Sequence, residues 1–232
     1  MQQIKVLVTG HFNDAEFNRF RTISPRLTIV RRPVAQTLSL SDTSNLFEGD
    51  EEGFYGFMPP RNLSKAPRMK WVQLHSAGVN HLNGHPIMHS NILITTMSGI
   101  HAVPIGEFVI MMTLALARHV PEMVRMQDRG EWPKERSKKF RTSELRGKTL
   151  GIVGYGSIGR EAARIAKVGF NMRVFALTRT GKKEDLGYVE SDIGDPDGRF
   201  PDAWFRPKQL LELLSQSDFV LISVPLLPTH ET

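Results

Sequence analysis

Residues 154–183 read GYGSIGREAARIAKVGFNMRVFALTRTGKK, and the glycines at the start of this stretch decide the fold. The spacing G-x-G-x-x-G is carried by Gly154, Gly156 and Gly159. It follows a strand predicted over residues 148–153 and opens a helix predicted over residues 158–168, the context in which such a turn receives the pyrophosphate of a dinucleotide. The N–H groups of Ser157 and Ile158 and the positive end of the helix would then face the phosphates. A glycine turn that serves packing alone is the alternative.

The end of the next predicted strand, residues 172–177, bears on which dinucleotide is bound. An NAD site carries Asp or Glu at this point, about twenty residues after the glycines, to hold the adenine ribose. This sequence instead offers hydroxyl groups and cations, namely Thr178, Arg179, Thr180 and Lys182. Hydroxyl donors and a guanidinium fork suit a 2′-phosphate, so the sequence favours NADP over NAD. An exposed Arg179 that stacks on adenine is the alternative, and it is compatible with either cofactor.

The composition is that of an ordinary globular protein, with 40% hydrophobic and 23% charged residues among 232. Cysteine is absent, which excludes disulfides, thiolate catalysis and cysteine-ligated metal. The N-terminal residues lack the apolar stretch of a signal peptide. The longest apolar run, residues 102–117, is shorter than the ~20 residues needed to cross a bilayer. We therefore expect a cytoplasmic protein with no membrane partner.

The net charge of +6 raises the question of nucleic acid. Much of the excess lies in residues 134–146 (KERSKKFRTSELR), where Phe140 is the sole aromatic residue. Single-strand binding sites combine cations with stacking aromatic side chains, so this stretch is first interpreted as a solvated loop. Nucleic acid is not an expected partner, and binding through this loop stays as an alternative.

Strand-like and helix-like runs alternate in the first half of the chain. Strands are predicted over residues 4–8, 27–30, 53–58, 71–74 and 92–95, and a helix over residues 15–23. This alternation predicts an α/β fold with a parallel sheet. The pattern changes near Ser98 and Gly99, so we place a boundary there, between a first domain over residues 1–98 and a second over residues 99–232.

The second half opens with a long helix predicted over residues 102–126, in which Pro104 is tolerated because it lies in the first turn. Its apolar surface predicts burial between two domains or two subunits. The glycine turn with its strands and helix follows, then an irregular insert over residues 181–205 and a helix that begins near Pro207. The last strand, residues 219–224, is apolar on both faces, as an interior parallel strand requires, yet one side of it would be unpaired. The order predicts half of a doubly wound sheet.

Several short motifs, in this order and spacing, resemble the D-isomer-specific 2-hydroxyacid dehydrogenase family. They are WVQLHSAGV at residues 71–79, GIHA at 99–102 with Gly106 and Glu107, RGEW at 129–132, LRGKTLGIVGYG at 145–156 and VPL at 224–226. The resemblance implies an NAD(P)-dependent oxidoreductase that transfers a hydride between nicotinamide and a 2-hydroxy or 2-oxo acid, similar to glyoxylate and hydroxypyruvate reductases. It also implies a flavodoxin-like substrate domain, residues 1–98, and an incomplete Rossmann domain, residues 99–232.

The resemblance also assigns further site residues and a partner. Backbone N–H groups of Ala77, Gly78 and Val79 would hold the substrate carboxylate, because adjacent amides on a turn form an anion nest. Ile105 matches a position that lines the nicotinamide. Val224 and Pro225, in the last motif, are further cofactor-binding candidates. The helix over residues 102–126 would form a homodimer interface.

The family's catalytic Arg, Glu and His come after the motif with which this sequence ends. We therefore assign no catalytic residue to this chain and expect the three beyond Thr232, within about 100 further residues that would complete the sheet. A C-terminally truncated member, inactive alone, is the resulting expectation. His85 and His89 lie four apart, but the intervening Pro86 and the lack of nearby carboxylates argue against a metal site. A non-catalytic dinucleotide-sensing or scaffold protein of the same fold is the alternative function.

Overall fold

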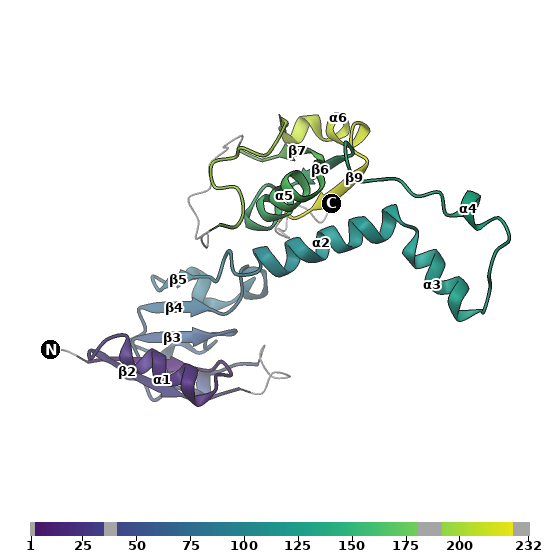
Figure 1. The fold of residues 1–232 in the computed structure, drawn as a ribbon. Helices are drawn as coiled ribbons and strands as arrows, with labels where there is room; N and C mark the ends of the chain where they lie inside the picture. Colours follow the sequence, from purple (N-terminus) through teal and green to yellow (C-terminus); the bar gives the residue numbers. More distant parts are fainter. Residues whose placement is uncertain (1–2, 35–40, 181–191, 225–232) are drawn as a thin grey trace. The chain divides into compact units, whose positions relative to one another are not determined.

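The computed structural model describes residues 3–34, 41–180 and 192–224 (Figure 1). The predictions for Lys182 and Pro225 fall outside these residues. The chain forms two compact units that divide between Ser98 and Gly99. Each unit is built on a parallel sheet with helical connections, so the predicted α/β class is confirmed.

The first unit contains a five-stranded sheet in the order β2-β1-β3-β4-β5. All neighbours are parallel, and this is the strand order of flavodoxin-like sheets. The strands are β1 (Ile4–Val8), β2 (Leu27–Arg31), β3 (Gly53–Gly56), β4 (Trp71–Leu74) and β5 (Leu93–Thr95). All the strands predicted for this half are therefore present. Its core includes the fully buried Leu7, Phe54, Val72 and Leu74.

Helix α1 (Asp14–Thr22) follows β1 and is fixed at its start by a capping box. The Asn13 side chain accepts from the Glu16 N–H, and the Glu16 carboxylate accepts from the Asn13 N–H, both at 2.9 Å. The later connections hold only short 3₁₀ turns in the described residues: η2 (Ser44–Leu46), η3 (Leu63–Lys65), η4 (Asn80–Leu82) and η5 (Pro86–His89). Frequent prolines and glycines in these connections favour turns over long helices.

The second unit contains a four-stranded parallel sheet in the order β8-β7-β6-β9. Its elements after the glycines match the predicted order of strand, turn, helix and strand. They are β6 (Thr149–Val153), α5 (Ser157–Phe170), β7 (Arg173–Leu177), β8 (Ala203–Phe205), η6 (Pro207–Gln209), α6 (Leu210–Ser215) and β9 (Phe219–Ile222). The strand β8, which lies in the insert, was not predicted. Its three residues are too few to show a periodicity.

Strand β9 forms one edge of this sheet as far as the structure describes it. It pairs with β6, and Val220 and Ile222 are 42% and 71% exposed. An apolar strand with one unpaired side is what the sequence predicted for this segment.

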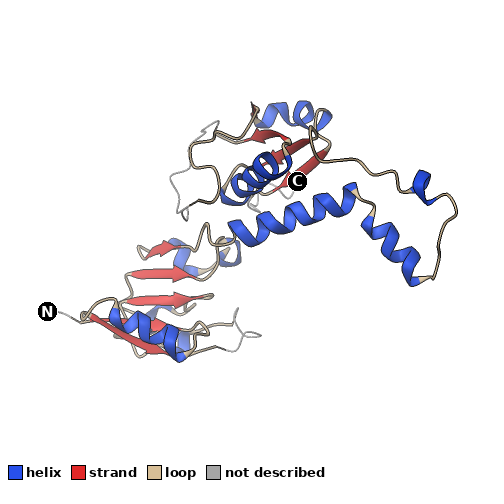
Figure 2. Ribbon diagram, in the orientation of Figure 1, coloured by secondary structure: helices blue, strands red, loops and turns tan. Residues whose placement is uncertain are grey.

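The single helix predicted over residues 102–126 is wrong. The structure has α2 (Ala102–Ala117) and α3 (Val120–Asp128), which are bent by 68° at the break (Figure 2). His119 between them adopts a left-handed conformation with φ of 56°. The reason is Pro121, which lacks an N–H and would clash with the carbonyl group four residues earlier if the helix continued. Proline is accommodated in the first turn of α3, as Pro104 is in that of α2.

The helices of the described residues differ in length and apolar character. None of them alone is long and apolar enough to cross a bilayer, although α2 and α3 taken together reach the required length and composition despite the bend.

Candidate functional site

The glycine turn joins the carboxyl end of β6 to the start of α5, and two of its glycines are fixed by close packing. Gly154 has a φ of 98°, and a Cβ atom on it would lie 2.7 Å from the carbonyl oxygen of Ser223. A Cβ atom on Gly159 would lie 2.6 Å from the carbonyl oxygen of Gly154 and 2.9 Å from Ile152. Any larger residue at either position would push α5 or β9 away from β6.

Gly156 differs from its two neighbours, because no atom lies within 4 Å of the place where its Cβ atom would be. It is the N-cap residue of α5, and its carbonyl oxygen accepts the Arg160 N–H at 2.9 Å. The N–H groups of Ser157, Ile158 and Gly159 precede this bond and have no acceptor within the helix. Open space, converging donors and the positive end of a 14-residue helix together fit an anionic diphosphate.

The candidates for an adenine-ribose contact lie at the same edge of the sheet. Val153 and Leu177 are register partners in β6 and β7, so the residues that follow them emerge side by side. The Thr178 N–H donates to the carbonyl oxygen of Phe205 at 3.1 Å, and Thr178 is half-buried. Arg179 and Thr180 are exposed. The three residues supply hydroxyl and guanidinium donors and no carboxylate, which suits a phosphate better than a free ribose hydroxyl.

The other flank of the glycine turn is formed by the residues after β9. The Ser223 N–H donates to the carbonyl oxygen of Val153 at 2.9 Å, and its hydroxyl donates to that of Gly154 at 2.8 Å. A Cβ atom on Gly154 would lie 2.9 Å from Val224, whose side chain is 41% exposed. Val224 therefore borders the turn, as a cofactor contact would.

Sequence reasoning missed a buried polar cluster behind the glycine turn. The Tyr155 hydroxyl donates to Asp195 Oδ2 at 2.6 Å, and the Arg160 guanidinium donates to the Asp195 carbonyl oxygen. Burial, with the hydrogen bond to Asp195, raises the pKa of Tyr155 far above its ordinary value, so the phenol stays a donor. The GDPDG turn at residues 194–198 predicts a bend, but nothing in the sequence relates it to a tyrosine 40 positions earlier.

A second buried carboxylate, Glu161, ties α5 to its neighbours. It accepts from the Arg164 guanidinium at 2.6 and 2.8 Å and from the Gly194 N–H at 2.6 Å. Its side chain also lies against α2, where a Cβ atom on Gly106 would come within 2.8 Å of Glu161 Cγ. Burial alone would raise the pKa of Glu161, but Arg164 and the Gly194 N–H hold it below its ordinary value.

The remaining candidates are distributed over both units. Ala77, Gly78 and Val79 form an exposed turn between β4 and η4, in which the Ser76 hydroxyl donates to the Gly78 carbonyl oxygen at 2.8 Å. Ile105 is half-buried in the first turn of α2.

A cavity of about 320 Å³ lies in the first unit, at the carboxyl ends of β1, β3 and β4. His75 is among its lining residues and is hydrogen-bonded through Nδ1 to the Tyr55 hydroxyl at 2.5 Å. Burial raises the pKa of Tyr55, so this phenol also stays protonated.

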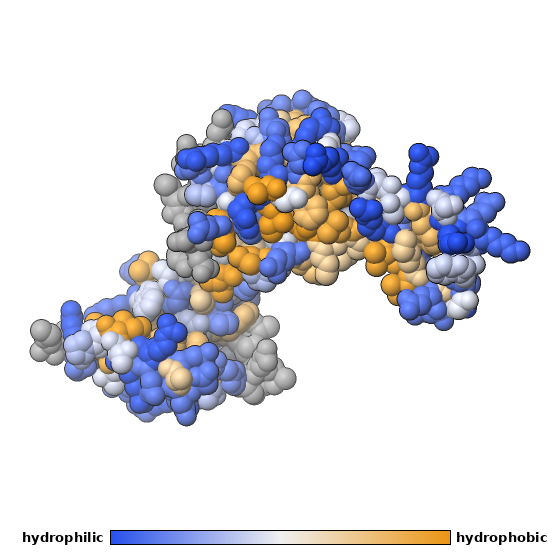
Figure 3. Space-filling model, in the orientation of Figure 1, coloured by the Kyte–Doolittle hydropathy of each residue, from blue (hydrophilic) through white to orange (hydrophobic). Residues whose placement is uncertain are grey.

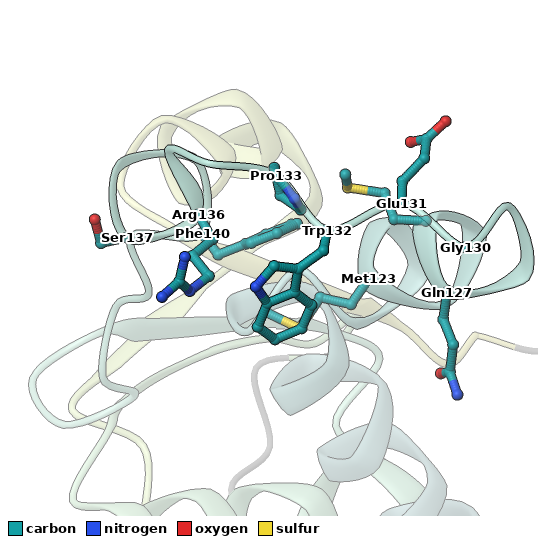
Figure 4. Close-up of a pocket in the computed structure, with 10 residues that line it drawn as sticks. Met123, Gln127, Gly130, Glu131, Trp132, Pro133, Arg136, Ser137 and Phe140 are labelled. Atoms are coloured by element: carbon teal, nitrogen blue, oxygen red, sulfur yellow. The ribbon is translucent and has the colours of Figure 1, made fainter.

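A second cavity, of about 780 Å³, is mainly apolar and belongs to α3 and the chain that follows it (Figure 4). Met123, Trp132 and Phe140 line it, and the Trp132 side chain is 80% exposed. The Arg136 guanidinium lies 5.4 Å from the centre of the Trp132 ring. No residue of the glycine turn is among the residues that line this cavity.

Histidine and carboxylate side chains of the described residues are possible metal ligands. His85 is buried, and its Nδ1 accepts the Ile87 N–H at 3.2 Å, so it serves as a cap for η5. Oxygen atoms of Glu48, Asp50 and Glu51 lie within 4.8 Å of one another. Lys5 Nζ already pairs with Glu48 at 2.6 Å and Asp50 at 2.7 Å, and the Arg32 guanidinium pairs with Glu48, so the chain's own cations balance two of the three negative charges.

Known proteins resemble this chain in both sequence and fold. The family model described as D-isomer specific 2-hydroxyacid dehydrogenase, NAD binding domain, matches residues 110–232. Glyoxylate reductase of Pyrococcus furiosus is 35% identical over 174 residues, which are 73% of this chain and 47% of that protein. Glyoxylate reductase of Aeropyrum pernix is 34% identical with the same coverage. The chain spans about half the length of these curated relatives.

Solved structures give the same picture of the fold. A D-isomer specific 2-hydroxyacid dehydrogenase family protein from Aeromonas salmonicida superposes with a TM-score of 0.70 at 22% identity, over 98% of this chain and 66% of that one. An NADPH-dependent glyoxylate/hydroxypyruvate reductase from Sinorhizobium meliloti, solved with NADP and sulfate, has a TM-score of 0.68 at 20% identity, over 98% and 64%. At these identities the likeness concerns the fold.

Proposed function

Because this chain belongs to the D-isomer specific 2-hydroxyacid dehydrogenase family, we propose that its glycine turn binds NADP(H) for the reduction of a small 2-oxo acid such as glyoxylate or hydroxypyruvate. The family consists of oxidoreductases that act on the CH–OH group of 2-hydroxy acids. The observation that carries the proposal is the open approach to Gly156 beside the unpartnered first turn of α5.

The preference for NADP(H) rests on the end of β7. A carboxylate there would repel a 2′-phosphate, and the chain has Thr178 at that place with the exposed Arg179 and Thr180 after it. A guanidinium binds phosphate oxygens in a fork and gains from the charge as well as from the hydrogen bonds. Two structural neighbours, 19% and 20% identical to this chain, were solved with NADPH or NADP, in agreement with this preference. The preference itself rests on Thr178, Arg179 and Thr180.

The proposal gives each remaining candidate residue a role in holding the reactants. The bound cofactor would supply the hydride. Ile105 and Val224 would contact the cofactor, and the backbone amides of Ala77, Gly78 and Val79 would hold the substrate carboxylate. The catalytic Arg, Glu and His are not assigned to any residue of this chain. The matched segment covers 47% of the Pyrococcus furiosus glyoxylate reductase, so about half of that protein has no counterpart in the match.

The test compares two glycine-to-alanine changes in one helix. Gly156→Ala places a methyl group in the open space, so the fold is kept while the pyrophosphate is kept away from the donors. Gly169→Ala, near the other end of α5, also meets open space and serves as the control. Isothermal titration with NADPH should show about fiftyfold weaker binding for Gly156→Ala, as expected for losing one or two charge-assisted hydrogen bonds. Gly169→Ala should bind NADPH with unchanged affinity. Equal affinity in the two variants would overturn the proposed site.

Catalysis is tested separately, by following NADPH oxidation with glyoxylate and hydroxypyruvate. The 232-residue chain is expected to bind NADPH without rapid turnover, because no catalytic triad residue is assigned to it. Vigorous turnover would show that the chain contains its own catalytic groups and would refute that assignment. A non-catalytic dinucleotide sensor, the alternative function, predicts that a full-length form with the same binding site is also inactive.

Nucleic-acid binding through the basic loop has less support. Lys139 Nζ pairs with Glu122 at 3.1 Å and Lys138 Nζ with Glu135 at 3.9 Å, so part of the positive charge is already balanced. Binding to random-sequence DNA that weakens steeply with salt, together with no affinity for NADPH, would favour this alternative.

We also propose that α2 and α3 form a homodimer interface, in place of the single helix predicted. Several of their exposed side chains are large and apolar, among them Phe108, Met111, Leu116 and Val124. Hydrophobic residues gather over the α2–α3 region in Figure 3. A monomer rarely exposes a contiguous surface of this kind. Light scattering should therefore give a dimer for the wild type and a monomer for the double variant Met111→Glu, Leu116→Glu. Val168→Glu, at an even more exposed apolar position on α5, should stay dimeric.

A further inference from the structure

The segment of residues 194–200 is bonded to the start of α5, and we call this segment the brace. Asp195 Oδ1 accepts the Arg199 N–H at 2.7 Å, and its Oδ2 accepts the Phe200 N–H at 3.0 Å, which closes the brace on itself. The same Oδ2 accepts the Tyr155 hydroxyl at 2.6 Å. The brace is thus a rigid loop with one carboxylate at its centre, and that carboxylate reaches the glycine turn.

Three consecutive contacts join the brace to the residues around the turn. Tyr155 bonds to the Asp195 carboxylate, Arg160 to the Asp195 carbonyl oxygen, and Glu161 to the Gly194 N–H at 2.6 Å. Asp195 and Arg160 are each 3% exposed, and Tyr155 is 5% exposed. Water competes poorly for hydrogen bonds at such depth, so each bond holds its geometry and leaves an unsatisfied group if it is broken.

The aromatic ring of Tyr155 makes two close contacts as well. The Arg160 guanidinium carbon lies 4.8 Å from its centre, and the Trp204 ring meets it edge-on with centres 5.2 Å apart. Tyr155 stands between Gly154 and Gly156, the two residues whose peptide groups set the direction of the turn. Gly154 is held by its packing against Ser223, but no atom lies near the Cβ position of Gly156, so the anchored tyrosine restricts the backbone on that side of the turn.

We propose that Asp195 and Tyr155 are positioning residues, and that the brace holds the N–H groups of the glycine turn in the orientation that binds the pyrophosphate. The inference rests on the proposed function, since it presumes a dinucleotide at this turn. It gives the insert between β7 and β8 a role in cofactor affinity. Preorganised donors bind an anion more tightly because they lose less freedom on binding.

The test uses two conservative variants and one control. Tyr155→Phe removes the hydroxyl and keeps the ring, and Asp195→Asn places an amide group opposite donors. Asp197→Asn is the control, because Asp197 lies in the same loop but is exposed and pairs with Arg199. Titration with NADPH should show affinity about fivefold weaker for Tyr155→Phe and about tenfold weaker for Asp195→Asn, with no change for Asp197→Asn.

The affinity for adenosine 2′-monophosphate distinguishes a role in positioning the N–H groups of the turn from a merely structural role. This nucleotide has the 2′-phosphate but no pyrophosphate, so its affinity, measured by ligand-observed NMR, should be the same in all the folded variants. Unchanged NADPH affinity in Tyr155→Phe and Asp195→Asn would overturn the inference, and so would equal losses for both nucleotides. Failure of the wild type to bind NADPH would instead overturn the proposed function on which the inference stands. Circular dichroism below the melting temperature confirms that each variant is folded.

Discussion

Two turns of this chain are proposed to offer backbone N–H groups to an anion, and they are built differently. The turn after β6 runs directly into a helix of 14 residues and is packed against Ile152 and Ser223. The turn after β4, residues 77–79, is exposed and leads into a 3₁₀ turn of three residues. A Cβ atom on its Gly78 would meet only the Asn80 side chain, at 3.2 Å. The first turn is fixed by the fold around it, whereas the second depends on local hydrogen bonds. We therefore expect the first to bind an anion alone and the second to need further groups.

The largest expected effect is a difference in stability between glycine-to-alanine variants of the two turns. Gly154→Ala forces a Cβ atom into a left-handed conformation and against the Ser223 carbonyl group, so the free energy of unfolding of the second unit should fall by about 3 kcal/mol. Gly78→Ala should change that of the first unit by less than about 0.5 kcal/mol. Urea unfolding measures the losses, and hydrogen exchange in β6 and β4 assigns them to a unit. Similar losses at the two positions would remove the distinction between the turns.

The contrast also explains what the sequence could predict. The glycine turn is determined by residues that are neighbours in the chain, so a local pattern suffices to find the strand, the turn and the helix. The brace was missed because Asp195 meets Tyr155 only after the sheet has formed, and no spacing rule links them. The break at His119 was missed for a different reason. Residues 102–126 keep a helical, apolar character on both sides of Pro121, and the proline alone carries the signal.

The end of β7 lies beside the turn after β6 and carries Arg179, the proposed contact of the 2′-phosphate. Arg179→Ala should weaken NADPH binding about tenfold, because one charge-assisted contact to the 2′-phosphate is lost. NADH binding should stay the same, since NADH carries no phosphate at that position. Arg173→Ala, at the opposite end of the same strand, is the matched control. Equal losses for NADPH and NADH would mean that Arg179 stacks on adenine instead, and the preference for NADP(H) would have no basis.

The smallest expected effect is on the stability of the protein at acidic pH. A buried carboxylate, Glu161, supports the turn after β6 and not the turn after β4. Glu161 has a pKa below its ordinary value of 4.5 in the folded protein, owing to Arg164 and the Gly194 N–H, which together outweigh its burial. Its ion pair therefore stabilises the second unit fully above pH 4.5, and this stability is lost as the pH falls through the lower, folded-state pKa.

Glu161→Gln tests this dependence, because the amide has no charge to lose. The variant should be less stable than the wild type at neutral pH and should show a shallower decline of unfolding free energy below pH 4.5, measured by urea unfolding at a series of pH values. Glu107→Gln, at an exposed position on α2, should keep the wild-type decline. If Glu161→Gln declined as steeply as the wild type, another group would account for the acid sensitivity. The rigidity of the glycine turn would then have to be explained by the packing of Gly154 and Gly159 and by the brace, without a contribution from this ion pair.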